Sequence, residues 1–164
     1  MTTPIATGLY DAVRASRLAE GLNDTQTALL AGLLTLQACQ GGEVLAREAS
    51  ADNRLYVIVD GSLAIVKGQG TLDETPLVTL TAGDFAHELG FLDGAPRHAS
   101  LIAASDARVL VLERERLESL IDTQPRILYA VMCNIVRTVH RVQTRLAIQA
   151  TELTNYIVKQ HGRY

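Results

Sequence analysis

The middle of the chain, residues 43–113, consists of short apolar runs separated by turn residues. Runs of this length, rich in leucine and β-branched residues, are typical of β-strands. The six runs are Val44–Glu48, Leu55–Val59, Leu63–Lys67, Leu77–Leu80, Ser100–Ala104 and Val109–Glu113. Many short strands with closely spaced turns predict a double-stranded β-roll resembling a jelly roll. With helices on either side, the fold class is mainly β with helices, α+β.

Two details support a closed roll. Asp60-Gly61 stands between two of the runs and is the strongest hairpin signal in the chain. Both faces of Leu55–Val59 are apolar, as a strand inside a barrel-like roll can require.

Residues 1–42 are expected to form an N-terminal helical segment. Tyr10 to Glu20 has apolar residues at helical spacing, and Asn23 or Asp24 can cap a second helix. The apolar stripe of this second helix, which should end before Gly41-Gly42, is Leu29, Leu30, Leu33 and Leu34.

After the roll, assigned to residues 43–122, a short helix is expected from Arg114 to Ile121. Pro125 then begins a long helix, within residues 123–164, that should end at His161-Gly162. Its apolar positions are Leu128, Met132, Ile135, Val139, Val142, Leu146, Ala150, Leu153 and Ile157. At about 1.5 Å per residue the helix spans roughly 50 Å, longer than a small domain is wide.

Because of this length, the second half of the long helix needs another partner. We expect a homodimer through this helix; a monomer with a solvent-facing stalk is the alternative. Arg137, Arg141 and Arg145 form a basic ridge on it, expected to be solvated rather than to bind a partner.

The segment Gly83–Ser100 contains one acid, Glu88, and one guanidinium, Arg97, on either side of an apolar turn. A single helical turn between them would direct free N–H groups toward an anion. Arg97 can bind phosphate oxygens in a bidentate manner, and Glu88 can accept hydrogen bonds from sugar hydroxyls. Together these residues predict a site for a small phosphorylated sugar.

Residues His87-Glu88-Leu89-Gly90 and Gly94-Ala95-Pro96-Arg97-His98-Ala99-Ser100 resemble the phosphate-binding cassette of cyclic-nucleotide-binding domains. This family includes the catabolite activator protein and the regulatory subunits of cAMP-dependent protein kinase. The resemblance implies that Glu88 accepts from the ribose 2′-hydroxyl and that Arg97 clamps the cyclic phosphate. It further implies that Leu89, Gly90, His98 and Ala99 line the ligand, either cAMP or cGMP.

Two residues depart from the family pattern. His87 stands where the family usually has Gly, so its ring either points away or narrows the pocket. His98 stands where a small residue is usual, which removes the sequence feature that separates cAMP from cGMP. The alternative function is therefore that of an assembly module, a degenerate roll that no longer binds nucleotide. An imidazole ring of His87 or His98 that fills the cassette would favour this alternative over the nucleotide sensor.

The remaining features exclude other classes. A net charge of −3 does not favour non-specific nucleic-acid binding, and the chain stops before a helix-turn-helix could follow, so no direct DNA contact is expected. Cys39 and Cys133, far apart in apolar sequence, are expected to be reduced thiols of a cytoplasmic protein. We expect no metal site, no catalytic set, no signal peptide and no membrane span. The predicted function is a ligand sensor with an unknown protein effector, not an enzyme.

Overall fold

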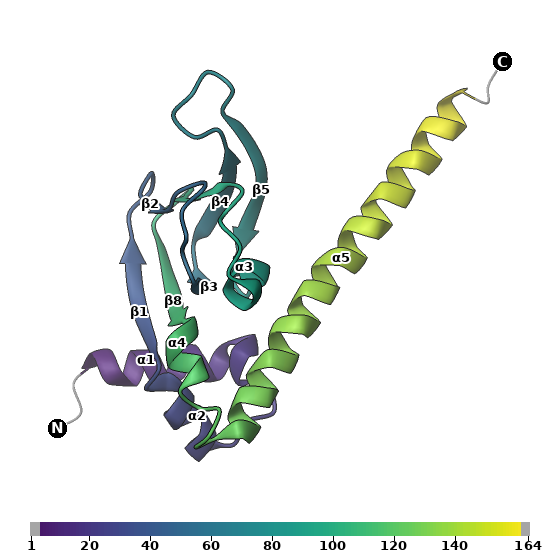
Figure 1. The fold of residues 1–164 in the computed structure, drawn as a ribbon. Helices are drawn as coiled ribbons and strands as arrows, with labels where there is room; N and C mark the ends of the chain where they lie inside the picture. Colours follow the sequence, from purple (N-terminus) through teal and green to yellow (C-terminus); the bar gives the residue numbers. More distant parts are fainter. Residues whose placement is uncertain (1–3, 162–164) are drawn as a thin grey trace.

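Two four-stranded antiparallel sheets face each other in the computed structural model, which describes residues 4–161 (Figure 1). The strand order is β1-β8-β3-β6 in one sheet and β2-β7-β4-β5 in the other. The strands are β1 Leu34–Cys39, β2 Val44–Ala46, β3 Arg54–Asp60, β4 Ser62–Lys67, β5 Thr75–Thr81, β6 Phe85–Ala86, β7 Ser100–Ala103 and β8 Ala107–Glu113. The β-roll and all six predicted strands are therefore confirmed; β1 and β6 were not predicted.

The hairpin at Asp60-Gly61 is confirmed, since Gly61 alone separates β3 from β4. Its φ of +77° lies in the left-handed region. A Cβ on Gly61 would overlap the Asp106 carbonyl oxygen and come within 2.7 Å of Ala107 Cα. Glycine is required here by both the backbone angle and the close approach of the β7–β8 turn.

Strand β3 separates two apolar cores, which confirms that both of its faces are apolar. Tyr56 and Ile58 point between the two sheets, together with Leu63, Leu101, Val109 and Val111. Leu55 and Val57 point to the opposite side, where the helices cover the sheet. Each fully buried aliphatic side chain contributes roughly 1.5–3 kcal/mol, so both faces of this strand stabilise the fold.

The N-terminal helices differ in extent from the prediction. The region predicted as one helix, Tyr10 to Glu20, divides between α1, Pro4–Ala15, and a 3-10 turn η1, Arg17–Ala19. Helix α2, Asp24–Ala31, begins as predicted, because Asn23 and Gln26 form a reciprocal capping box.

The second helix was wrongly extended to Gly41. It ends at Ala31, and residues 34–39 form β1, which pairs along its whole length with β8. Leucines at this spacing fit a helix and a strand alike, and the ladder with β8 supplies the backbone hydrogen bonds that a longer helix would have made. The roll therefore begins at Leu34 rather than at residue 43.

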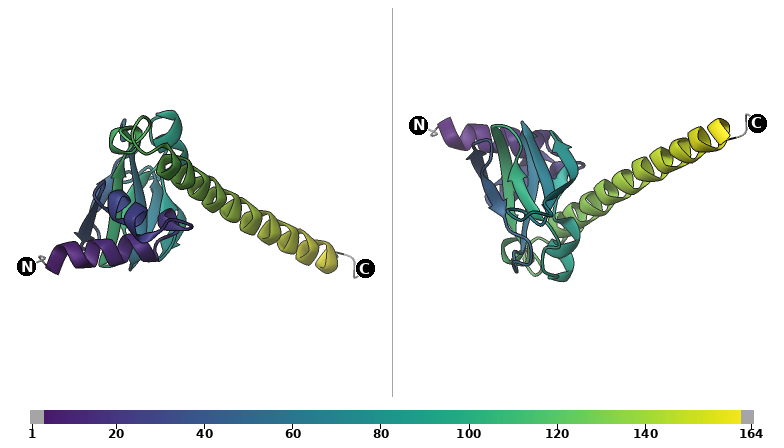
Figure 2. Two further views of the ribbon diagram at one scale, coloured as in Figure 1. Left: turned by 90° about the horizontal axis from the view of Figure 1, so that it is seen from below. Right: turned by 90° about the horizontal axis from the view of Figure 1, so that it is seen from above.

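Helix α4, Arg114–Glu118, leads into α5, Pro125–His161, close to the predicted bounds. Residue Gly162 of the predicted helix exit lies outside the described residues. Ile127, Val131 and Ile135 are fully buried against the roll and the N-terminal helices. From residue 143 to residue 160 every side chain is exposed, and α5 extends well beyond the rest of the molecule (Figure 2). Three residues of the predicted apolar stripe, Leu128, Met132 and Val139, are only half-buried. The helix face that packs against the roll is the neighbouring one, which carries the three buried residues named above.

A buried amide fixes α5 to the N-terminal segment. The Asn134 side-chain nitrogen donates to the carbonyls of Leu18 and Glu20, each at 2.9 Å, and its oxygen accepts from Arg137 at 3.0 Å. Asn134 is 2% exposed, and its removal would take this donor from the carbonyl of the buried Leu18 and from that of Glu20. This contact is one of those that hold the long helix to the domain.

Cys39 is buried and Cys133 half-buried, and both are free thiols. In the part of the chain that the structure describes, no group of three or more His, Cys, Asp or Glu could hold a metal ion. None of the helices described there combines the length and apolar character needed to cross a membrane.

Candidate ligand-binding site

Arg97 is held by backbone hydrogen bonds to the loop that follows β2. Ala49 N–H donates to the Arg97 carbonyl at 2.6 Å, and Arg97 N–H donates to the Ser50 carbonyl at 3.1 Å. Ala49 has a φ of +64°, an unfavourable angle for a residue with a Cβ. Strained residues of this kind concentrate at functional sites, where the surrounding structure holds them.

The guanidinium of Arg97 turns inward and its side chain is only 4% exposed. Its Nη2 lies 3.2 Å from Asp52 Oδ2 and donates to the Arg54 carbonyl at 3.3 Å. The guanidinium also lies over the Tyr56 ring, 5.3 Å from the centroid. Burial lowers the pKa of Arg97, and the charge of Asp52 opposes that shift. Burial also raises the pKa of Tyr56, to about 12, so its hydroxyl stays protonated.

One carboxylate in this site serves two guanidinium groups. Asp52 Oδ1 accepts from Arg54 Nε at 2.8 Å, and Oδ2 accepts from Arg54 Nη2 at 3.0 Å, in addition to the Arg97 contact. Burial opposes ionisation of Asp52, but hydrogen bonds from Arg54 and the charge of Arg97 outweigh it, so its pKa lies below the ordinary value. The cluster of Asp52, Arg54 and Arg97 therefore carries one unbalanced positive charge.

The predicted helical turn is present as α3, Glu88–Asp93. Its first backbone hydrogen bond runs from Phe91 N–H to the His87 carbonyl at 3.0 Å, so the amides of Glu88, Leu89 and Gly90 precede it. Leu89 is 62% exposed, whereas Gly90 is buried. Burial, reinforced by the charge of Asp84, raises the pKa of the half-buried Glu88. Among the described residues, Arg97 is ion-paired with Asp52 and not with Glu88.

The two cassette histidines behave differently. The His87 ring turns inward: its Nδ1 lies 3.3 Å from the Arg54 carbonyl oxygen, and a Cβ on Gly90 would overlap the ring. His98 is exposed, and its carbonyl accepts from Lys67 Nζ at 2.9 Å. Ala99 is buried behind it. Of the two alternatives for His87, the structure shows that the ring narrows the cassette.

The basic ridge on α5 contacts acceptors of the same molecule. Arg141 lies 3.6 Å from Glu20, and Arg145 lies 3.8 Å from Asp84, which precedes β6. All four side chains except that of Asp84 are about half exposed, so each pair is worth about 0–1 kcal/mol. The ridge is exposed to solvent, as expected, and two of its arginines also lie within ion-pair distance of acids of the domain.

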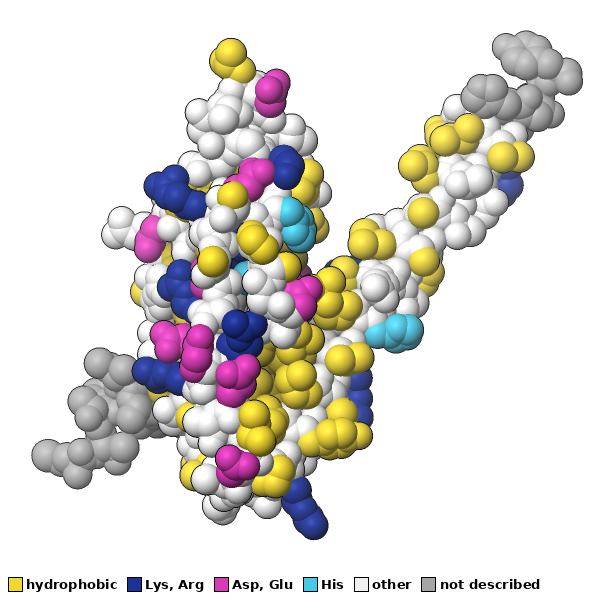
Figure 3. Space-filling view, viewed as in Figure 1, with side chains coloured by type: hydrophobic (Ala, Val, Ile, Leu, Met, Phe, Trp, Pro, Cys, Tyr) yellow, Lys and Arg dark blue, Asp and Glu magenta, His cyan; other side chains and the backbone are white. Residues whose placement is uncertain are grey.

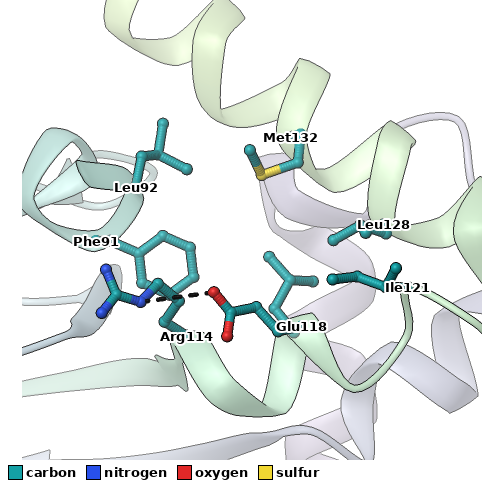
Figure 4. Close-up of a pocket in the computed structure, with 8 residues that line it drawn as sticks. Phe91, Leu92, Arg114, Glu118, Ile121, Leu128 and Met132 are labelled. Atoms are coloured by element: carbon teal, nitrogen blue, oxygen red, sulfur yellow. Dashed lines mark ion pairs between the residues drawn. The ribbon is translucent and has the colours of Figure 1, made fainter. Parts of the chain in front are cut away.

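An apolar pocket of about 190 Å³ lies where α3, α4 and α5 meet (Figure 4). Phe91 and Leu92 of α3 line one side, and Leu128 and Met132 of α5 line the other. The floor and rim are formed by Leu117, Ile121 and the pair of Arg114 Nε and Glu118 Oε1, 3.7 Å apart. The cassette helix and the long helix are therefore neighbours with unfilled space between them.

Sequence reasoning missed Asp52, Arg54 and Tyr56. Residues 50–53 suggested only a turn, because an Asp-Asn pair fits a turn without any partner. Asp52 and Arg97 are 45 positions apart, and only the packing of the β2–β3 loop against the cassette brings them together. The one available signal was the charged Arg54 directly before the apolar run Leu55–Val59.

Comparison with known proteins agrees with this architecture. The family model for the cyclic nucleotide-binding domain matches residues 36–124. A cAMP-dependent protein kinase regulatory subunit from Hypocrea atroviridis is 30% identical over 100 residues, which cover 61% of this chain and 21% of that protein. A CRP-like cAMP-activated global transcriptional regulator from Mycobacterium tuberculosis is 26% identical over 120 residues, which cover 73% of this chain and 54% of that protein.

The fold comparison gives the same class. The crystal structure of a cyclic nucleotide-binding domain from Methylobacillus flagellatus matches with a TM-score of 0.73 at 18% identity, covering 94% of this chain and 85% of that one. The chain belongs to the cyclic nucleotide-binding domain family. It spans about half the length of the mycobacterial regulator and about a fifth of the kinase subunit. Both relatives are named as regulators rather than as enzymes.

Proposed function

We propose that the protein is a sensor module that binds cAMP or cGMP in the cassette and performs no chemistry on it. The observation that carries this proposal is the unbalanced positive charge of the cluster formed by Asp52, Arg54 and Arg97. The Asp52 carboxylate is shared between Arg97, whose side chain is 4% exposed, and Arg54, whose side chain is 38% exposed, and the single negative charge of a cyclic phosphodiester would balance the second guanidinium. The names of both relatives make cAMP the first ligand to test.

In this proposal Arg97 clamps the cyclic phosphate, and the backbone around Leu89, Gly90, His98 and Ala99 surrounds it. Glu88 accepts a hydrogen bond from the ribose 2′-hydroxyl. The raised pKa of Glu88 fits this role. It results from burial, and burial also keeps away water that would compete with the ribose hydroxyl for the carboxylate.

The proposed signal passes from the cassette to α5 by a shift between two populations. Two features of the structure support this route. The apolar pocket lies between Phe91 of α3 and Met132 of α5, and Asp84 forms an ion pair with Arg145 of α5. Ligand that reorders α3 would change how α5 packs, because α3 and α5 both line the pocket.

We further propose that a second copy of the chain covers the projecting half of α5. The large apolar side chains exposed on that half are Leu146, Ile148, Leu153, Tyr156, Ile157 and Val158. Apolar side chains also gather on the side of the roll that faces α5 (Figure 3). A protein effector would then contact the dimer. Direct DNA contact by α5 is not favoured, because Arg141 and Arg145 already lie near acids of the domain.

Calorimetric titration with cAMP and then cGMP tests the proposal, repeated on Arg97→Ala and Arg97→Lys. Loss of a buried charged contact costs about 2–5 kcal/mol, so we expect binding of the wild type and a loss of roughly 30-fold or more in both variants. Thermal unfolding of each variant checks that the fold is retained. Unchanged affinity in folded Arg97→Ala would mean that the anion binds elsewhere.

The alternative function is an assembly module that has kept the roll and binds no nucleotide. The inward His87 ring favours it, because that ring occupies space beside Gly90 within the cassette. Absence of heat with both ligands in folded wild-type protein, together with a stable dimer, would support this alternative.

A further inference from the structure

His87 and Arg97 meet at one backbone atom. The His87 Nδ1 and the Arg97 Nη2 each lie 3.3 Å from the Arg54 carbonyl oxygen. Since a carbonyl can only accept, Nδ1 carries the hydrogen, and Nε2 of the neutral ring is left with a lone pair. The ring is thus fixed in one tautomer beside the proposed phosphate clamp.

Each of these two side chains has a second polar atom that lacks a partner. His87 Nε2 and Arg97 Nε are both buried, and neither has a hydrogen-bond partner among the described residues. The side chain of Arg97 is more than nine-tenths buried. Orphaned buried polar atoms are uncommon and costly, so two of them on side chains that share one carbonyl indicate a place for a ligand atom.

The two orphaned atoms differ in what they require. Arg97 Nε is a donor and needs an acceptor such as an anionic oxygen. The neutral His87 Nε2 would repel the same oxygen, whereas an imidazolium would donate to it. An anion that reaches both atoms therefore satisfies both groups only if His87 gains a proton.

The backbone at His87 strengthens the case. Its φ of +70° places it in the left-handed region, at a cost of about 1–2 kcal/mol for a residue with a Cβ. A glycine would avoid this cost, and His87 and Ala49 are the two non-glycine residues with positive φ in the part of the chain described. Both lie next to the Arg97 segment, which points to a role in the site.

We propose that His87 is a ligand-contacting residue that takes up a proton when the anionic phosphate binds, which makes ligand affinity depend on pH. This inference rests on the proposed function. It adds a titratable group, His87, to a site in which Arg97 alone was proposed to bind the phosphate.

The charges around the ring fix the direction of the effect. Burial lowers the pKa of His87 in the free protein, and so do the charges of Arg97 and His98, while Asp52 and the Arg54 carbonyl act in the opposite direction. A bound anion adds a favourable negative charge and raises the pKa. The affinity for the anion then rises as the pH falls through the pKa that His87 has in the complex. It levels off below the lower pKa that His87 has in the free protein.

Calorimetry with cAMP at pH 6, 7 and 8, in pairs of buffers with different ionisation enthalpies, measures the protons taken up per site. We expect uptake of up to one proton by the wild type, a rise in affinity of at most about 10-fold per pH unit, and neither effect in His87→Gln. His98→Gln removes the exposed cassette imidazole and should keep the uptake.

The outcomes separate the two proposals. Binding that is independent of pH, or proton uptake that persists in His87→Gln, overturns the role of His87 and leaves the nucleotide sensor in place. Absence of binding at all three pH values, with Arg97→Ala indistinguishable from the wild type, overturns the nucleotide sensor and this inference together.

Discussion

Asp52 and Arg97, 45 positions apart in sequence, form an ion pair of 3.2 Å in which both side chains are more than nine-tenths buried. The pair joins the β2–β3 loop to the cassette, and Arg54 contacts the same carboxylate. Replacing the carboxylate by a neutral amide removes the counter-charge that the two guanidinium groups share and leaves the buried Arg97 without an ion-pair partner among the described residues.

We predict that Asp52→Asn lowers the free energy of unfolding by about 3–5 kcal/mol at neutral pH. Because the pKa of Asp52 is depressed in the folded protein, its contribution is complete above the unfolded value and is lost as pH falls through the folded value. The difference between the two proteins should therefore be full above roughly pH 5 and shrink below about pH 4. Urea unfolding across this range measures it.

Asp73→Asn is the matched control, since Asp73 is exposed in the β4–β5 loop and only its backbone is hydrogen-bonded. It should unfold like the wild type at every pH. An equal loss in both variants would show that the buried pair does not stabilise the fold.

Gly90 and His87 are predicted to be energetically coupled, because a methyl group at position 90 would overlap the imidazole. Gly90→Ala should cost about 1–3 kcal/mol in the wild type. In the His87→Gly background the same change should be neutral or stabilise by up to about 1 kcal/mol, since alanine favours a helix. A double-mutant cycle from denaturant unfolding gives the coupling, and additive single changes would contradict the contact.

The Asn134 anchor yields a third prediction. Asn134→Ala removes both donors to Leu18 and Glu20, and we expect a loss of about 1–3 kcal/mol together with faster amide exchange in η1. Asn155→Ala, an exposed position on the same helix, is the control and should change neither quantity. Equal exchange rates in η1 for all three proteins would mean that Asn134 does not hold the helix.

The proposed dimer yields a fourth prediction. Replacing Leu146 and Leu153 by Glu places charges on the apolar side of α5 and should convert a dimer into a monomer in sedimentation equilibrium. The control changes Thr144 and Thr151 to Glu, with the same charge and spacing but on the side of the helix opposite the stripe of Leu146, Leu153 and Ile157, and should leave a dimer that forms through this stripe intact. A wild type that sediments as a monomer would overturn the dimer proposal.

Local patterns predicted most of the fold. The Asp60-Gly61 hairpin and the two-sided β3 follow from turn chemistry and residue alternation, which act over a few positions. The boundary between α2 and β1 could not be predicted this way, because its leucines suit either structure and the ladder with β8 decides between them. Strand β6 was not predicted, because its two residues are too few to show the alternation typical of a strand.

In the candidate site, the sequence predicted the segment that contains Glu88 and Arg97, but not the residues that contact Arg97 in the fold. Glu88 and Arg97 stand out within one short segment of the sequence, whereas the contact with Asp52 depends on how a distant loop packs. The orientation of the His87 ring could not be predicted either, since it is set by the left-handed backbone and by the Arg54 carbonyl. Packing between distant segments therefore determines the part of the site that sequence patterns leave open.

The length of α5 beyond its attachment has a mechanical consequence. From Asn134 to residue 160 the helix extends about 39 Å, at about 1.5 Å per residue. It can act as a lever arm: a tilt of about 10° at the anchor would move the far end by about 7 Å, more than one helical pitch of about 5.4 Å. A displacement of a fraction of an ångström beside the cassette would thus be magnified several-fold where the exposed apolar side chains lie.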